Sequence, residues 1–121
     1  IDYDHLQYFG ARDTGNYVSV WPIDHGDVAF ECNIVGCYYR NDIQNYVGEF
    51  KGYLMAEPGN RHDSNAIKVM ADDGHHVGYI PRNLTKKIRE FRRLPCDCYG
   101  FIDIRMGDEG PLFFTCLYLK Y

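Results

Sequence analysis

Aromatic and basic side chains occur together at three places in the sequence where they could bind a nucleic acid. One place is the run 38–40, the second is the polar segment 59–65, and the third is the stretch 79–86. Single strands are held by rings that stack on bases, at about 1 to 3 kcal/mol per base, and by cations that follow the phosphates. The candidate rings are Tyr38, Tyr39, His62 and Tyr79, and the candidate charges are Arg40, Arg61, Arg82 and Lys86. A single-stranded nucleic acid is one ligand that such a set of side chains could bind.

The distribution of charge matters more here than the formal net charge of −4. Residues 1–30 hold five acids and one base, so the remainder of the chain is balanced, with twelve of the 17 acids and twelve of the 13 bases. Within that remainder, residues 81–93 carry six bases against one acid, Glu90. A local basic segment of this kind is typical of phosphate binding, although it is also found on helix faces that are merely solvated.

The elements that must hold these residues are mostly strands. Apolar runs and turn signals predict strands over 28–36, 49–58, 96–104 and 112–121, with a loop over 38–46. Asp73-Gly74 lies between two apolar segments of the stretch 66–80, which predicts a hairpin. Closure into a barrel would remove exposed sheet edges, so we expect a mostly β fold, a small closed antiparallel β-barrel.

One short basic helix is expected after the hairpin. Asn83 can cap it, and Leu84, Ile88 and Phe91 recur at a spacing that gives one buried stripe. The lysines and arginines then fall on the other faces, and Pro95 prevents the helix from continuing.

An ordered motif runs through residues 56–84, AEPGNRHDSNAIKVMADDGHHVGYIPRNL. It resembles the core of the HIRAN domain, which reads roughly EP-x-N-x-x-D-x-N-A-I-x-V, a hairpin, and V-G-Y-I-P-R-x-L. The matching residues are Glu57, Pro58, Asn60, Asp63, Asn65, Ala66, Ile67, Val69, Val77, Gly78, Tyr79, Ile80, Pro81, Arg82 and Leu84. A looser resemblance covers about residues 28 to 120. We therefore expect a HIRAN-like domain over 26–121, preceded by an acidic extension over 1–25 with room for one edge strand.

The resemblance implies an OB-like or SH3-like barrel, of the type found in fork-remodelling SWI/SNF translocases and in bacterial proteins, that grips a 3′ single-stranded DNA end. Asp63 would accept a hydrogen bond from the terminal sugar hydroxyl, since a carboxylate beside a phosphate groove needs a specific use. His62 stands where the family carries an aromatic residue, and Arg40 follows two tyrosines where the family has Arg before the aromatic. The expected site comprises Tyr38, Tyr39, Arg40, Asn60, Arg61, His62, Asp63, Tyr79, Arg82 and Lys86.

The function that follows is a targeting module for the 3′-hydroxyl end of single-stranded DNA in repair or replication-fork processing. We expect a monomer without catalytic residues, cofactor or metal, which acts with a helicase, translocase or nuclease. Two alternatives stay open, namely a protein-interaction module on the same barrel, and DNA or RNA binding without end preference.

Several of these residues also have a purely structural interpretation. Asp63 and Asn65 can form Asx-turns that shape their own loop, and at least one of Tyr38 and Tyr39 is expected to face the core. Glu57 with Pro58 is expected to end a strand rather than to bind a ligand.

Other classes of protein fit the sequence poorly. The five cysteines are an odd number on strand-like segments, which argues against a secreted disulfide framework and for a reducing cytoplasm. Cys96-x-Cys98 on a regular strand does not match the knuckle spacing of structural zinc sites. No nucleophile, base and orienting group occur in catalytic order, and no apolar run is long enough to cross a membrane.

Overall fold

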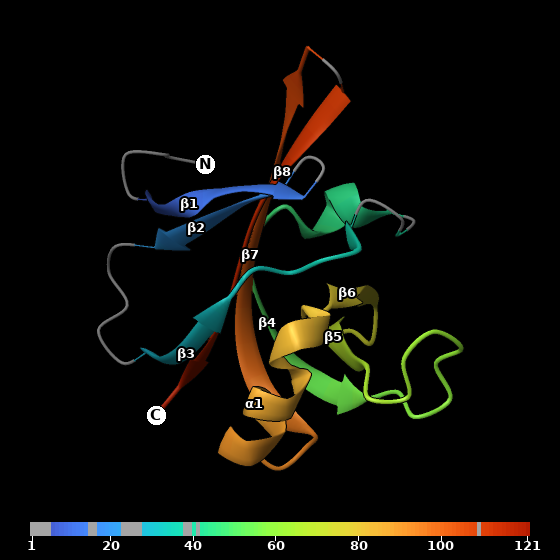
Figure 1. Cartoon of the computed structure of the whole chain (residues 1–121). Helices are drawn as coiled ribbons and strands as arrows, with labels where there is room; N and C mark the ends of the chain where they lie inside the picture. The colour runs from blue at the N-terminus through green and yellow to red at the C-terminus, as the bar shows by residue number, and fades with distance from the viewer. Residues whose placement is uncertain (1–5, 15–16, 23–27, 38–39, 41, 109) are drawn as a thin grey trace.

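The computed structural model describes residues 6–14, 17–22, 28–37, 40, 42–108 and 110–121, with side chains from residue 28 onward. Eight strands form one sheet in the order β1-β2-β8-β7-β4-β5-β6, and β3 also pairs with β8 (Figure 1). The strands are β1 (Leu6–Thr14), β2 (Tyr17–Pro22), β3 (Val28–Cys32), β4 (Gly48–Ala56), β5 (Ile67–Ala71), β6 (His76–Tyr79), β7 (Cys96–Gly107) and β8 (Gly110–Lys120). The helical elements are the 3-10 turns η3 (Ile43–Tyr46) and η4 (Arg82–Leu84) and the helix α1 (Thr85–Phe91).

The predicted hairpin is confirmed as β5 and β6. The two strands pair antiparallel, and the Gly74 amide donates to the Ala71 carbonyl over 2.9 Å at the turn. Gly74 has φ +88°, a left-handed conformation that glycine adopts without the steric cost that a Cβ brings. The turn residues of the sequence therefore fix this hairpin locally.

The predicted barrel-like fold with one short helix is confirmed, but its closure differs from the expectation. From β3 through β8, β7, β4 and β5 to β6 the strands pair antiparallel and curl into a half-barrel. A single residue pair then bridges the gap, because Val35 and Tyr79 exchange backbone hydrogen bonds of 2.9 and 2.8 Å. The chain turns directly after Val35, at Gly36, whose φ is +78°.

The N-terminal region contains two strands where the sequence predicted one edge strand. β2 corresponds to the predicted strand and runs parallel to β8, with Tyr17 opposite Phe113. β1 pairs antiparallel with β2, and its register shifts twice, between Tyr8 and Ala11 and between Ala11 and Thr14. Such irregularities interrupt the alternation of side chains, so periodicity alone did not reveal β1.

The main core lies inside the curl and contains apolar side chains from the strands and from α1. Its fully buried members include Ile34, Leu54, Ile67, Val69, Val77, Ile88, Ile102, Leu117 and Leu119. Burial of one such side chain contributes about 1.5 to 3 kcal/mol. Ile88 therefore attaches α1 to the sheet and fixes where the following basic residues point.

The start and the stripe of the predicted helix need correction. Asn83 does not cap it, because Pro81 opens the 3-10 turn η4 and Asn83 already lies within that turn. Leu84 occupies the N-cap position of α1 without a side-chain cap. Phe91 is 39% exposed rather than buried, and its ring lies 6.3 Å from the ring of Phe30.

Candidate nucleic-acid interface

A pocket of about 220 Å³ lies where the β4–β5 loop meets the end of β6 and the start of η4. Its lining includes five of the predicted site residues, which come from two separate stretches of the chain: Asn60, His62, Asp63, Tyr79 and Arg82. Val35, Ala66 and Ile80 supply its apolar part. The backbone bridge between Val35 and Tyr79 therefore brings the chain after β3 to this pocket.

Glu57 organises one side of the pocket, although the sequence suggested only that it ends a strand. The Tyr79 hydroxyl donates to Glu57 Oε1 over 2.8 Å, and the Asn60 amide donates to the same oxygen over 2.6 Å. Lys68 Nζ lies 3.7 Å from Glu57 Oε2. Partial burial opposes ionisation of Glu57, but these hydrogen bonds and the Lys68 charge lower its pKa overall. Glu57 is therefore a carboxylate that fixes Tyr79.

Tyr79 presents its ring to the pocket because its hydroxyl is already engaged. Burial and the hydrogen bond to Glu57 both raise the pKa of Tyr79, so the phenol stays protonated and continues to donate. The Asn60 amide also lies 3.4 Å from that hydroxyl. A ring fixed at its polar end offers a surface on which a base can stack with little loss of side-chain entropy.

Two Asx-turns shape the loop that carries Asp63. The turn at Asp63 confirms the structural interpretation of the sequence, but the second turn is made by Asn60, and Asn65 takes part through its backbone amide. Asn60 Oδ1 accepts hydrogen bonds from the His62 and Asp63 amides at 2.8 and 3.0 Å. Asp63 Oδ1 accepts from the Asn65 amide at 2.9 Å. This use of Asp63 leaves its second oxygen, Oδ2, for another partner.

Arg82 is that partner, and it also contacts the loop. Arg82 Nε lies 3.5 Å from Asp63 Oδ2, and Arg82 Nη2 donates to the His62 carbonyl over 2.8 Å. The Arg82 side chain is 72% exposed and that of Asp63 is 20% exposed. Exposed ion pairs of this type contribute about 0 to 1 kcal/mol, so either group can exchange its partner for a ligand at small cost.

Arg40 lies near the ring of Tyr79 and contacts His76, a residue that the sequence did not predict for the site. The Arg40 guanidinium is 5.9 Å from the centre of the Tyr79 ring, and Nη1 contacts His76 Nδ1 at 3.1 Å. A guanidinium can only donate, so His76 Nδ1 accepts and His76 Nε2 carries the proton that it donates to the Gly78 carbonyl over 2.8 Å. Burial, with the Arg40 charge as a further cause, lowers the pKa of His76.

Two further predicted residues, Arg61 and Lys86, are not part of the described lining of the pocket. Arg61 and Lys86 are exposed, on the β4–β5 loop and on α1 respectively. Tyr38 and Tyr39 lie outside the described residues. Sequence reasoning missed the apolar lining residues Val35, Ala66 and Ile80 as members of the site. It also missed Glu57 and His76, and Glu57 belongs to the motif that carried the resemblance.

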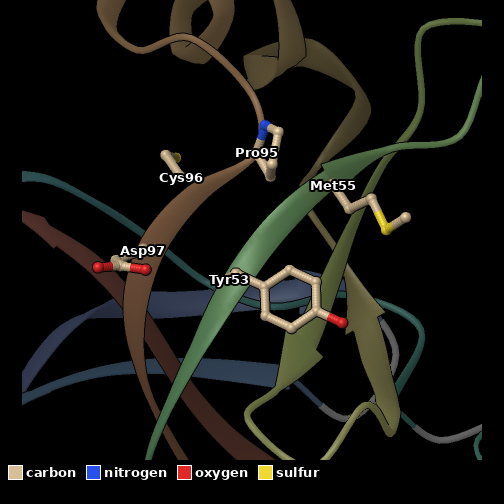
Figure 2. A pocket seen from close by; sticks show the side chains of 5 residues that line it. All are labelled: Tyr53, Met55, Pro95, Cys96 and Asp97. Carbon is tan, nitrogen blue, oxygen red and sulfur yellow. The ribbon is translucent and has the colours of Figure 1, made fainter.

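A second hollow, of about 420 Å³, is lined by Tyr53 and Met55 of β4 and by Pro95, Cys96 and Asp97 at the start of β7 (Figure 2). It is larger than the first pocket, but it contains none of the predicted residues. Among its described lining residues, the only charged side chain is the carboxylate of Asp97, which repels phosphate. The smaller pocket is therefore the better candidate for a nucleic acid.

The thiols are not activated for chemistry. Burial raises the pKa of Cys32 and of Cys37 to about 12, and it also raises the pKa values of Cys96, Cys98 and Cys116. A thiol must lose its proton to act as a nucleophile or to bind a metal. Among the described residues, no three His, Cys, Asp or Glu side chains converge as a metal site. No helix in the described part of the chain is long and apolar enough to cross a membrane.

Comparison with known proteins identifies the family. The model of the HIRAN domain matches residues 27–107, from the start of β3 to the end of β7. A crystal structure of a protein from Lactobacillus plantarum is similar, with a TM-score of 0.48 and 24% identity over 78% of this chain and 96% of that chain. No curated protein matches the sequence significantly. The matched segment contains the whole pocket and more than half of the chain, and the protein therefore belongs to the HIRAN domain family.

Proposed function

We propose that this domain binds single-stranded DNA and that its pocket receives the terminal nucleotide at a 3′-hydroxyl end. Membership of the HIRAN family points to nucleic-acid binding, and the family is one of binding domains. The observation that supports recognition of the strand end is the pairing of Asp63 with Arg82 at the pocket. A carboxylate and a guanidinium match the 3′-hydroxyl and the 5′-side phosphate of a terminal nucleotide.

The two groups have different tasks in the bound state. Asp63 Oδ2 accepts a hydrogen bond from the terminal 3′-hydroxyl, and Arg82 turns to the phosphate on the 5′ side of the same nucleotide. The weak, exposed contact between Nε and Oδ2 is exchanged for two charge-assisted hydrogen bonds to the ligand. The ring of Tyr79, with His62 opposite in the loop, provides the stacking surface for the base.

This arrangement distinguishes a 3′-hydroxyl from a 3′-phosphate. A hydroxyl donates to Asp63, whereas a phosphate ester brings negative oxygens close to the carboxylate. Because stacking and phosphate contacts tolerate any base, the domain has little base preference and binds a single strand more tightly than a blunt duplex.

In the cell the domain serves as a targeting module in DNA repair or replication-fork processing. It acts as a monomer in the cytoplasm, with residues 26–121 as the binding domain and residues 1–25 as an acidic extension. Any hydrolysis or strand movement comes from a helicase, translocase or nuclease that works with it.

Binding without end preference is the second candidate, because the Asx-turn of Asp63 gives this carboxylate a structural use. A fluorescence anisotropy titration with three ligands separates the candidates: a single strand ending in 3′-hydroxyl, the same strand ending in 3′-phosphate, and a blunt duplex. End recognition requires tightest binding of the first ligand. Equal affinity for the two single strands favours the second candidate, and no binding of any of them favours a protein-interaction module.

A further inference from the structure

Three basic side chains of η4 and α1 form a row along the loop that borders the pocket. Arg82 Nη2 donates to the His62 carbonyl over 2.8 Å, and Arg89 Nη2 donates to the Asn65 carbonyl over 3.1 Å. Lys86 is exposed, and its position three residues before Arg89 puts it on the same side of the helix. We refer to Arg82, Lys86 and Arg89 as the pocket-side row.

Two other basic side chains of the segment point elsewhere. Lys87 Nζ lies 5.9 Å from the centre of the Phe30 ring on β3. Arg92 donates to the Lys120 carbonyl at the end of β8, and its guanidinium lies 4.4 Å from the centre of the Phe91 ring. The segment therefore does not carry a uniform layer of solvated charge. Arg82 and Arg89 contact the loop beside the pocket, whereas Lys87 and Arg92 contact residues of β3 and β8.

The pocket-side row has donors to spare. A guanidinium carries five N–H groups, of which Arg89 uses one in its contact with Asn65 and Arg82 uses two in its contacts with His62 and Asp63. Planar guanidinium groups bind phosphate through two parallel hydrogen bonds. Arg82 and Arg89 can therefore each bind a phosphate while keeping a contact to the loop. Lys86 is exposed and can bind a phosphate as a point charge.

Arg82 belongs to both the pocket and the row, which gives the row a direction. A strand whose 3′ terminus occupies the pocket continues only on its 5′ side, and its next phosphates must pass over the surface beside Arg82. That surface is α1, which η4 joins directly to the pocket. Along it the positive charges follow in the order Arg82, Lys86 and Arg89, and Glu90 is the one acid of this segment.

We propose that the pocket-side row is a phosphate track, so that the bound single strand leaves the pocket over α1 in the 3′ to 5′ direction. The inference rests on the proposed function for its polarity. It identifies the ligand as a protruding strand of several nucleotides rather than a free nucleotide, because three cations contact successive phosphates beyond the terminal sugar.

The salt dependence of binding tests the track on the full chain, with a 3′-hydroxyl oligothymidylate as the probe. Each phosphate contact to a single strand contributes about 0.7 to the slope of log K against log salt concentration. Lys86→Ala and Arg89→Ala should each lower the slope by about that amount. Lys87→Ala removes the same charge from the same helix on the other side, and it should leave the slope unchanged.

Arg89→Lys separates a phosphate contact from support of the loop. Lysine keeps the charge but loses the guanidinium that contacts Asn65, so the slope should be retained even if the melting temperature falls. The proposed track would be refuted if Arg89→Lys lowered the slope of log K against log salt concentration as much as Arg89→Ala does. It would also be refuted if Lys87→Ala lowered this slope by an equal amount.

The direction of the bound strand over α1 is tested with oligothymidylates in which one phosphodiester linkage at a time is replaced with an uncharged methylphosphonate. Neutralising the linkage nearest the 3′ end should weaken binding to the parent protein but not to Arg82→Ala. Neutralising a linkage farther toward the 5′ end should weaken binding to the parent protein but not to Arg89→Ala. The reverse order would refute the proposed direction.

The test also distinguishes failure of the track from failure of end recognition. Arg89→Ala should leave the ratio of affinities for 3′-hydroxyl and 3′-phosphate strands unchanged, since Arg89 does not line the pocket. Equal affinities of the parent protein for the 3′-hydroxyl and 3′-phosphate strands would refute end recognition. The track would still be supported if substitutions in the pocket-side row, but not Lys87→Ala, lowered the salt dependence of binding.

Discussion

Asp63→Asn is the substitution that most directly tests recognition of the strand end. An asparagine oxygen can still accept from the Asn65 amide, so the Asx-turn that Asp63 Oδ1 makes over 2.9 Å is kept. What is lost is the negative charge that faces Arg82 and the pocket. The variant therefore separates the role of Asp63 in the loop from its role toward a ligand.

The expected size of the effect follows from the contacts that change. A hydrogen bond to a charged group contributes about 1.5 to 3 kcal/mol, against about 0.5 to 1.5 kcal/mol for a neutral one. Asp63→Asn replaces the first kind with the second toward the terminal hydroxyl, a loss of about 1 kcal/mol, or about fivefold in affinity. The 3′-phosphate strand should bind more tightly to the variant than to the parent, because the repelling charge is gone.

The loss of the ion pair with Arg82 has little effect on folding. The Arg82 side chain is 72% exposed, and pairs of this type contribute about 0 to 1 kcal/mol. The melting temperature of Asp63→Asn should therefore stay close to that of the parent. Asp63→Ala, which also removes the turn acceptor, should melt at a lower temperature and bind both strands less well.

The assay is a pair of anisotropy titrations with the 3′-hydroxyl and 3′-phosphate strands, accompanied by thermal melts of parent, Asp63→Asn and Asp63→Ala. Convergence of the two affinities in Asp63→Asn, at unchanged melting temperature, is the expected outcome. If instead both strands weaken equally in that variant, the carboxylate does not read the terminal group and the reasoning is wrong.

Three further outcomes are expected. His62→Tyr should preserve or raise single-strand affinity and His62→Ala should lower it, since a larger ring stacks better, and two silent substitutions would show that His62 does not stack. Because the pKa of His76 is lowered in the folded protein, the unfolded chain binds the proton of this histidine more readily. The free energy of unfolding should therefore fall as the pH decreases below the ordinary histidine pKa of about 6.5. His76→Gln can still accept a hydrogen bond from Arg40, and its melting temperature should depend less on pH in this acidic range. Gly78→Ala should destabilise the fold by about 1 to 3 kcal/mol in denaturant unfolding, because a Cβ there would lie 2.7 Å from the Val35 carbonyl oxygen, and a wild-type midpoint would contradict this.

Local sequence determined the elements whose signals are complete within a few residues. The β5–β6 hairpin follows from Asp73-Gly74 because glycine accepts the left-handed conformation of the turn wherever the hairpin is placed. The Asx-turns of Asn60 and Asp63 likewise involve only their immediate neighbours. The motif over residues 56–84 indicated the family because it spans the hairpin, both Asx-turns and the hydrogen bond from Tyr79 to Glu57.

The tertiary structure decided which of the candidate residues share a site. His76 and Arg40 are 36 positions apart, and the bridge between Val35 and Tyr79 brings the chain after β3 to the hairpin. Glu57 could be read as a strand end because its partner Tyr79 is 22 residues away. The direction of each basic side chain on α1 depends on the burial of Ile88 in the core, because a helix is oriented by what it packs against and not by its own sequence alone.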